Sequence, residues 1–380
     1  MRIGIITQPL HTNYGGLLQN YALQQALKRL GHEPITLDQD FYNPSILRIY
    51  LACIKTFILR LFGKGKNRTY PYHVSKTQKS TIRKNTDYFI NKYIVKTQVL
   101  DTIEQFRKST IDKQLDALVV GSDQVWRPIY NRNVLCSFFD FAKDLSIKRL
   151  AYAASFGVDF WEFSQQQTEQ AKELIRDFDA VSVREHSGID LCRKYLYCDA
   201  VHVLDPTMLL DKEDYIRLVE EENEPISKGN LFTYILDESD EKKLIIEKVA
   251  TELNLQPFTS MPKHKINKDT IKIDLKDCIY PPVTQWLYAF MDAKFVVCDS
   301  FHGAVFSVIF NKPFLIIGNK ERGMTRFYSL LDTFGLRNRM IDSITDVELL
   351  VDAPINWEKV NQIREKMKNY SLEYLKINLK

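Results

Sequence analysis

One histidine, His302, stands in the segment CDSFHGAVFSVIF (residues 298–310), where a predicted strand meets a predicted helix. Residues 293–298 have the apolar, β-branched composition of a strand buried on both faces. Ser300 is a typical helix-start residue, and residues 304–310 are apolar with helical spacing. Ligands of α/β sheets bind beyond the carboxyl ends of strands, and helix N-termini attract anions. His302 is therefore predicted to lie at a ligand site, the alternative being a core histidine that donates to a backbone carbonyl.

Polar residues follow other predicted strands in the same way. Asp123 comes after residues 117–120, Ser155 after 150–154, and the pair Arg184 and Glu185 after 180–183. Carboxyl ends of neighbouring parallel strands share one sheet edge, so these side chains are expected to converge there. Both features also have an interpretation that involves no ligand: Asp123 would cap a turn, and Arg184 and Glu185 would form a local ion pair on the surface.

The segment GNKERGMTRF (residues 318–327) places Lys320, Arg322 and Arg326 after the next predicted strand. Cations at strand ends, beside helix N-termini, favour a small, multiply charged anion. A solvated basic loop is the simpler interpretation of the same segment, because charged runs usually face water.

The elements that would position these residues form two α/β series. The first 40 residues have a strand–helix–strand pattern, and Gly15 and Gly16 do not complete the G-x-G-x-x-G motif of dinucleotide sites. Strands with polar ends continue to the stop at Asp205-Pro206, and a second series begins after an acidic stretch. We predict an α/β protein of two Rossmann-like, doubly wound domains that face one another across a cleft, with domains at residues 1–208 and 209–380.

Composition narrows the class of protein. A chain of 380 residues is long for a single hydrophobic core. Its 52 basic and 48 acidic residues nearly cancel, and a net charge of +4 is too small for a dedicated nucleic-acid-binding protein. Six cysteines without a CxxC pair, no signal-peptide pattern and no long apolar run indicate a cytoplasmic protein. Residues 46–62 are apolar with Arg48, Lys55 and Arg60 interspersed. They predict either a helix on an anionic membrane surface at the inner face of the cell membrane, or a helix packed on its domain.

Five segments in order, VVGSDQVW, AYAASFG, VSVREHSG, VLDPTMLL and CDSFHGAVFSVIFNKPF, resemble the polysaccharide pyruvyl transferase family over roughly residues 1–330. The resemblance implies a fold like that of GT-B glycosyltransferases and no cofactor or metal. It also implies transfer of the enolpyruvyl-derived group of phosphoenolpyruvate to a sugar, leaving a pyruvate ketal, in capsular or exopolysaccharide biosynthesis. The acceptor would be a sugar or a lipid-linked oligosaccharide.

The resemblance also implies residue roles. The family's donor-binding arginine falls on Arg184, its histidine on His302, and a later basic residue best matches Lys320. Ser300 and Phe301 stand where many relatives have Arg-Leu, so one donor-binding cation is missing. Lys320, Arg322 or Arg326 would then supply that charge beside Ser300.

For the chemistry, His302 would protonate C3 of the donor or only hold its phosphate or carboxylate. Asp123 would accept the proton of the sugar hydroxyl or bind the acceptor. The expected acceptor-binding residues are Asn13, Tyr14, Ser122, Asp123 and Gln124. Two other functions fit the same sequence: a GT-B glycosyltransferase that uses a nucleotide sugar, and a non-enzymatic carbohydrate-binding protein of a polysaccharide assembly complex.

Overall fold

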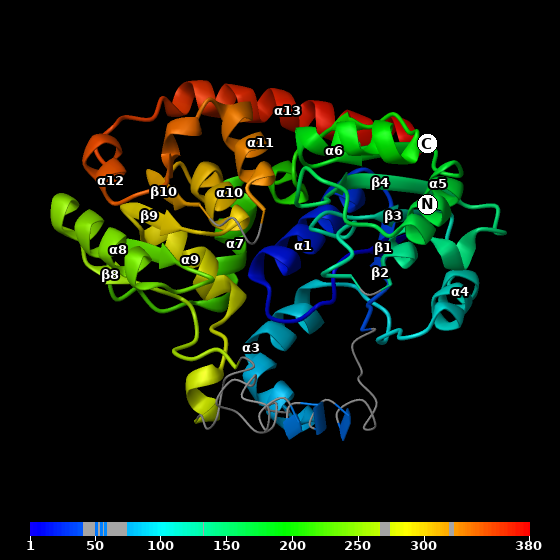
Figure 1. The fold of residues 1–380 in the computed structure, drawn as a ribbon, viewed down its shortest axis with the longest axis horizontal. Helices are drawn as coiled ribbons and strands as arrows, with labels where there is room; N and C mark the ends of the chain where they lie inside the picture. The colour runs from blue at the N-terminus through cyan, green and yellow to red at the C-terminus, as the bar shows by residue number, and fades with distance from the viewer. Residues whose placement is uncertain are drawn as a thin grey trace.

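Two parallel sheets, each covered by helices, lie side by side in the protein (Figure 1). The computed structural model describes residues 1–40, 50–51, 54–55, 57–58, 74–131, 133–266, 274–318 and 323–380. One sheet comes from the first half of the chain and the other from the second half. The predicted α/β class with two Rossmann-like domains is confirmed.

The N-terminal sheet has six strands in the order β2-β1-β3-β4-β5-β6, all pairs parallel. The prediction that four consecutive strands end along one sheet edge is confirmed, because β3 to β6 are neighbours in chain order. The strands are β1 (Arg2–Ile6), β2 (Glu33–Thr36), β3 (Ala117–Val120), β4 (Lys148–Ala154), β5 (Ala180–Val183) and β6 (Val201–His202). The helices of this half are α1 (Tyr14–Arg29), α3 (Lys76–Tyr93), α4 (Ile103–Asp112), α5 (Gln165–Ile175) and α6 (His186–Leu191).

The C-terminal sheet has five strands in the order β11-β10-β9-β7-β8, again parallel. Its strands are β7 (Leu231–Tyr234), β8 (Pro257–Phe258), β9 (Phe295–Cys298), β10 (Phe314–Ile317) and β11 (Met340–Ile341). The helices in this half of the chain are α7 (Lys212–Glu222), α8 (Asp240–Leu253), α9 (Val283–Asp292), α10 (Phe301–Ile309), α11 (Thr325–Phe334), α12 (Thr345–Leu350) and α13 (Trp357–Asn378).

Each sheet has one place where the strand order reverses. In the N-terminal sheet β1 lies between β2 and β3, and in the C-terminal sheet β7 lies between β8 and β9. Crossovers on the two sides of such a point run in opposite directions, which leaves a crevice at the carboxyl ends of the two central strands. The fold alone therefore points to the ends of β1 and β3 and of β7 and β9 as ligand-binding positions.

Two helices tie the halves together at opposite ends of the interface (Figure 1). At one end α13 returns to the N-terminal sheet, where Leu375 packs with Ile3 and the hydroxyl of Tyr374 donates to the carbonyl of Ala151 at 2.9 Å. At the other end α3 reaches the second half, where the amide of Asn85 donates to the carbonyl of Tyr280 at 2.7 Å. The relative position of the two sheets is thus fixed by packing and by hydrogen bonds.

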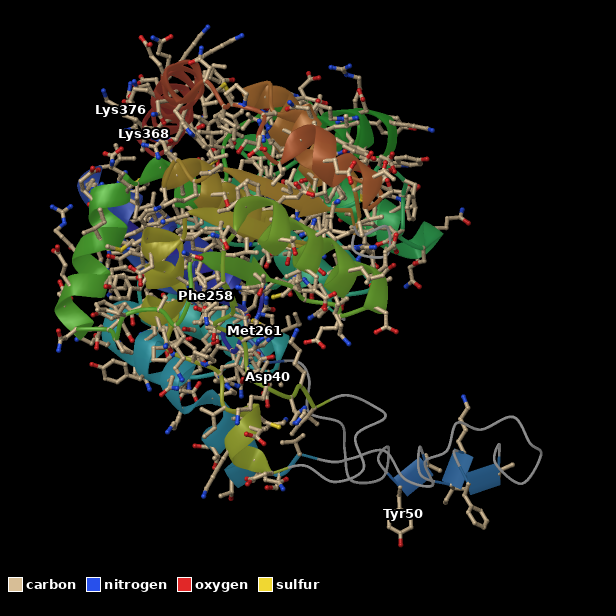
Figure 2. All side chains as sticks on the ribbon, turned by 90° about the vertical axis from the view of Figure 1, so that its left-hand side faces the viewer. Asp40, Tyr50, Phe258, Met261, Lys368 and Lys376 are labelled. Atoms are coloured by element: carbon tan, nitrogen blue, oxygen red, sulfur yellow. The ribbon has the colours of Figure 1, made fainter. Side chains whose placement is uncertain are left out.

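Most of the predicted basic amphipathic segment, residues 46–62, lies outside the residues that the structure describes, and so do Arg48 and Arg60. The large apolar side chains described within it are all exposed, and Tyr50 is labelled in Figure 2. They are Tyr50, Leu51, Ile54, Phe57 and Ile58. Within the described part of the chain, no helix combines the length and the apolar character needed to cross a bilayer.

Candidate active site

A cavity of about 400 Å³ lies where the reversal points of the two sheets meet. Loops after β1 and β3 form one wall, and residues at the ends of β7 and β9 form the other. The lining residues are Gln8, Pro9, His11, Thr12, Asn13, Asp123, Gln124, Tyr130, Tyr234, Leu236, Met261, Lys265, Tyr280, Ser300, Phe301, His302 and Arg326.

The predicted strand–turn–helix–strand unit around His302 is confirmed as β9, α10 and β10. The Ser300 side chain caps α10 by accepting from the backbone N–H of Gly303. Gly303 is required there, because a Cβ atom would lie 2.8 Å from the Cβ atom of Cys298. Asp299 accepts from the backbone N–H groups of Leu236 (2.6 Å) and Asp237, which fixes the loop after β7. This packing holds the first turn of α10 against the cavity.

His302 meets the other half of the protein at Gly15. A Cβ atom on Gly15 would overlap the imidazole ring, so the first turn of α1 and the first turn of α10 pack directly against each other through this glycine. Gly15 and Gly16 complete no dinucleotide motif, and the close approach of His302 explains why position 15 is a glycine. Nε2 of His302 is buried, makes no hydrogen bond with a described residue and lies 3.5 Å from Oδ2 of Asp205.

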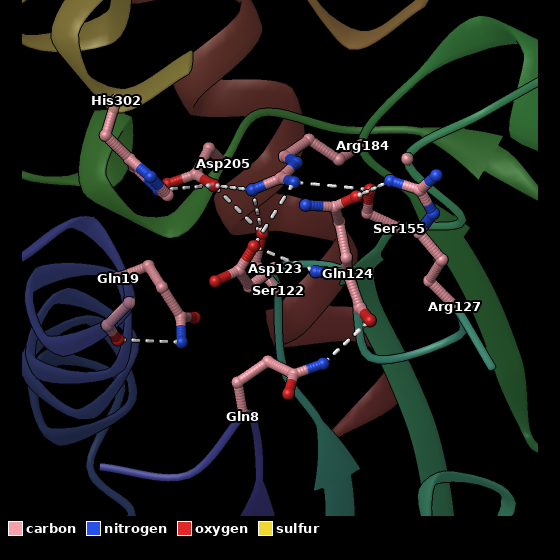
Figure 3. A network of polar contacts seen from close by, with 12 residues as sticks. Gln8, Gln19, Ser122, Asp123, Gln124, Arg127, Ser155, Arg184, Asp205 and His302 are labelled. Carbon is pink, nitrogen blue, oxygen red and sulfur yellow. Dashed lines mark hydrogen bonds and ion pairs between the residues drawn. The ribbon is translucent and has the colours of Figure 1, made fainter. Parts of the chain in front are cut away.

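A buried ionic cluster lies behind the cavity, with Asp205 between His302 and Arg184 (Figure 3). Oδ2 of Asp205 accepts from Nη1 of Arg184 at 2.9 Å and from the hydroxyl of Ser122 at 2.9 Å. Oδ1 accepts from the backbone N–H and the hydroxyl of Thr207. Both oxygens of this carboxylate are therefore engaged, and its orientation is fixed.

The charge of Asp205 is strongly favoured. Burial by itself would raise the pKa of Asp205, but His302 and Arg184 outweigh burial and hold that pKa well below its usual range. We did not single out Asp205 from the sequence as a site residue, although it follows β6 as the other polar residues follow their strands. Asp205 would have been found if polar residues directly after this fourth strand had also been taken as site candidates.

Arg184, predicted to bind the donor, is buried and is not among the residues that line the cavity. Its guanidinium contacts Asp205, the hydroxyl of Ser155 at 3.2 Å and Asp123 at 3.8 Å. The alternative of a surface ion pair with Glu185 is wrong, because Glu185 is buried and accepts from Ser155 and from two backbone N–H groups.

The ring of Phe301 lies near the guanidinium groups of two arginines, Arg184 and Arg326. The ring centroid of Phe301 lies 4.3 Å from the Arg184 guanidinium carbon and 5.9 Å from that of Arg326. Arg326 lines the cavity from the first turn of α11 and is buried, so this part of the basic segment is not a solvated loop. Burial, and next the charge of Arg184, lower the pKa of Arg326 to about 10, which leaves it cationic at neutral pH. An anion in this cavity would offset the repulsion between the two guanidiniums.

Among the predicted acceptor-binding residues, Asn13, Asp123 and Gln124 line the cavity, whereas Tyr14 and Ser122 do not. The Asn13 amide donates to Oδ2 of Asp123 at 3.0 Å, and the positive φ of Asp123, 74°, turns the chain sharply after β3. Tyr14 is buried and its hydroxyl donates to the carbonyl of Pro281 at 2.9 Å, so it joins the two halves instead. Ser122 is buried against Asp205.

Two predicted donor-binding residues, Lys320 and Arg322, lie outside the described residues. Several lining residues were not singled out from the sequence, among them Tyr130 and Lys265. The Lys265 ammonium donates to the carbonyls of Ile235 and Leu236 at the end of β7, and no sequence pattern marks that contact.

The sequence profile of one family, polysaccharide pyruvyl transferase, matches residues 13–321. The chain belongs to this family. The matched range contains His302, Arg184 and Asp205 and most residues that line the cavity. No curated protein sequence matches the chain significantly.

Solved structures with the same fold cover almost the whole chain at very low sequence identity. The UDP-GlcNAc 2-epimerase from Neisseria meningitidis aligns with a TM-score of 0.51 at 9% identity, over 100% of this chain and 99% of the epimerase. The Methanocaldococcus jannaschii UDP-GlcNAc 2-epimerase aligns with a TM-score of 0.49 at 12% identity, over 97% and 100% of the two chains. At 9% identity the likeness to the Neisseria meningitidis enzyme shows the fold alone, a GT-B-like pair of domains.

Proposed function

We propose that this polysaccharide pyruvyl transferase uses phosphoenolpyruvate as donor and forms a pyruvate ketal on two hydroxyls of a sugar in a capsular or exopolysaccharide precursor. The observation that carries the proposal is the position of His302 and Arg326 on one cavity wall and of Asn13, Asp123 and Gln124 on the opposite wall. The first wall offers an acid and a cation for a phosphorylated enol. The second offers amide and carboxylate groups for a polyhydroxylated acceptor.

The proposed reaction adds a proton to C3 of the donor and an acceptor oxygen to C2. His302 gives the proton, which turns the methylene into a methyl group and leaves positive charge at C2. One sugar hydroxyl bonds to C2 and loses its proton to Asp123. The C2–O bond to phosphate then breaks, phosphate leaves with the electron pair, and the second hydroxyl closes the ketal with loss of its own proton.

Cations of the cavity would stabilise the leaving phosphate. Arg326 would bind the phosphate or the carboxylate, with Lys320 and Arg322 as further candidates from the sequence. In this proposal Arg184, which does not line the cavity, acts through its charge and through Asp205 rather than as a direct donor ligand.

A thermal-shift measurement with phosphoenolpyruvate, UDP and a free sugar tests the donor. We expect phosphoenolpyruvate to raise the melting temperature of the wild-type protein and to have little effect on Arg326→Ala. Stabilisation by UDP alone would favour a nucleotide-sugar glycosyltransferase, and stabilisation by sugar alone a carbohydrate-binding protein.

The role of His302 is tested by two substitutions. As the proton donor, His302→Gln should lower turnover about 10²–10⁴-fold with donor affinity nearly unchanged. If His302 only anchors an anion, the loss should appear in the donor KM and His302→Lys should restore part of the activity. Near-normal turnover of the Gln variant, in protein of normal melting temperature, would contradict the proton-donor role.

We also propose peripheral contact with the inner face of the cell membrane through residues 46–62. The exposure of Tyr50, Leu51 and Phe57 supports this proposal. The protein should co-sediment with anionic vesicles, because each basic residue near such a surface contributes about 1 kcal/mol. This attraction is electrostatic, so co-sedimentation should decrease as the salt concentration rises. Equal sedimentation with neutral vesicles would contradict it.

A further inference from the structure

A second cavity, of about 730 Å³, lies between α3, the loop after β1 and residues 264–266 and 278–280. Both cavities have volumes in the range of about 300–1,000 Å³ that is usual for ligand sites. Figure 2 labels one lining residue of each, Met261 for the first cavity and Asp40 for the second. The two cavities adjoin, because they share the lining residues Gln8, Pro9, His11, Thr12, Tyr130 and Tyr280.

One wall of the second cavity is a polar face of α3. Lys79, Arg83, Asp87 and Asn91 follow one another at intervals of four residues, which places them on the same face of the helix. Arg83 pairs with Asp87 at 2.9 Å and also donates to the carbonyl of Leu10 at 2.8 Å. These contacts tie α3 to the loop after β1 and fix the polar groups of this wall.

The other charged residues of the second cavity follow β2 and α3 in the chain: Asp38, Asp40 and Lys96. Lys96 pairs with Asp38 at 3.0 Å. The three basic side chains that line this cavity, Lys79, Arg83 and Lys96, are therefore matched by three aspartates, whereas the first cavity has Lys265 and Arg326 against Asp123. Such a surface does not favour a phosphate chain, whereas alternating donors and acceptors beside Tyr130 and Tyr280 suit the hydroxyls and C–H faces of a neutral sugar.

His11 lies at the junction, since it lines both cavities. Its Nδ1 accepts from the backbone N–H of Thr12 at 2.7 Å. A neutral imidazole whose Nδ1 accepts a hydrogen bond carries its proton on Nε2. The junction therefore has a hydrogen-bond donor suited to an oxygen between two sugar units.

We propose that the second cavity is a subsite for the next sugar residue of the acceptor, so that the acceptor is a chain of at least two sugars. The inference rests on the proposed function, because it assigns the first cavity to the donor and the reacting sugar. His11 contacts the bridging region, and α3 provides the polar wall for the second sugar.

This subsite is tested by binding of the labelled 380-residue protein to an array that carries each terminal sugar as a mono-, di- and trisaccharide. For the preferred terminal sugar, we expect the di- or trisaccharide to bind with an apparent affinity at least about tenfold higher than the monosaccharide. Asn91→Trp and Lys79→Trp place a bulky ring in the cavity from an exposed helix position, and either should reduce binding to that of the monosaccharide. Lys84→Trp is the matched control, because Lys84 is exposed on α3 and lines neither cavity.

The subsite would be overturned if short and long sugars bound equally or if none bound. It would also be overturned if both tryptophan variants folded correctly and kept the wild-type preference for longer sugars. The donor is measured separately by the phosphoenolpyruvate thermal shift. A length preference without a donor shift would refute the proposed function and leave a sugar subsite, whereas a donor shift without length preference would refute only the subsite.

Discussion

Asp205→Asn removes a carboxylate that contacts both Arg184 and His302 in the buried cluster. Removing one partner of a buried ion pair usually costs about 3–5 kcal/mol. The asparagine keeps an oxygen for one of the donors on Arg184 or Thr207, so we expect the lower end, about 3 kcal/mol. With an unfolding entropy of about 2.1 cal/mol/K per residue, this loss lowers the melting temperature by about 4 °C if the whole chain unfolds as one unit.

The pH dependence of the free energy of unfolding tests whether the charge of Asp205 causes this loss of stability. Because the pKa of Asp205 is lowered in the folded protein, its charge stabilises the fold above the unfolded pKa of about 4, and that stability is lost as the pH falls toward the folded pKa. The difference in free energy of unfolding between wild type and Asp205→Asn should therefore be constant from about pH 6 to 8. Below about pH 4 the difference should become smaller.

Chemical denaturation of both proteins across this pH range measures that difference, and Asp332→Asn is the matched control. Asp332 pairs with Arg337 at 3.0 Å with both side chains about half exposed, and such a pair contributes about 1 kcal/mol or less. A loss for Asp205→Asn no larger than for the control, or a loss that is the same at pH 3 and pH 7, would refute the reasoning.

Three further predictions concern the interface and the cavity. Gly15→Ala should displace the ring of His302 and lower turnover at least about tenfold, and unchanged steady-state kinetics would contradict the close packing. Arg326→Lys keeps a charge but loses the planar fork, so calorimetry should give a phosphoenolpyruvate Kd between those of wild type and Arg326→Ala; equal Kd values for Lys and Ala would contradict bidentate binding. Tyr14→Phe leaves the carbonyl of Pro281 without its donor and should cost about 1 kcal/mol in denaturant unfolding, whereas no change would show that this contact does not stabilise the interface.

Local patterns in the sequence predict much of this fold. The apolar run before Ser300 and the helix spacing after it predict β9 and α10, because burial and capping depend on residues close in the chain. The partner of Arg184 could not be predicted in this way. Its neighbour Glu185 is the local candidate, but β5 and β6 lie side by side and bring in Asp205 from the end of the next strand.

The environment of Tyr14 could not be predicted from local sequence patterns either, because its hydrogen-bond partner Pro281 belongs to the other half of the chain. Helix α1 starts with the cap at Asn13, and this local signal does not say which side of its first turn a second domain will cover. Predictions were thus most reliable for single elements and least reliable where two domains supply one site.

Because the cavity forms only where the domains meet, its chemistry depends on how they are joined. His302 comes from α10, yet the groups that define its position, Gly15 and Asp205, belong to the N-terminal half. Contacts away from the cavity maintain this arrangement, including the backbone N–H of His186 that donates to the hydroxyl of Ser329 at 3.1 Å. A small change at such a contact would move the imidazole relative to Asp123 without touching either residue. If His302 gives the proposed proton, which requires hydrogen-bond distance, substitutions at these interdomain contacts should change turnover more than they change donor affinity.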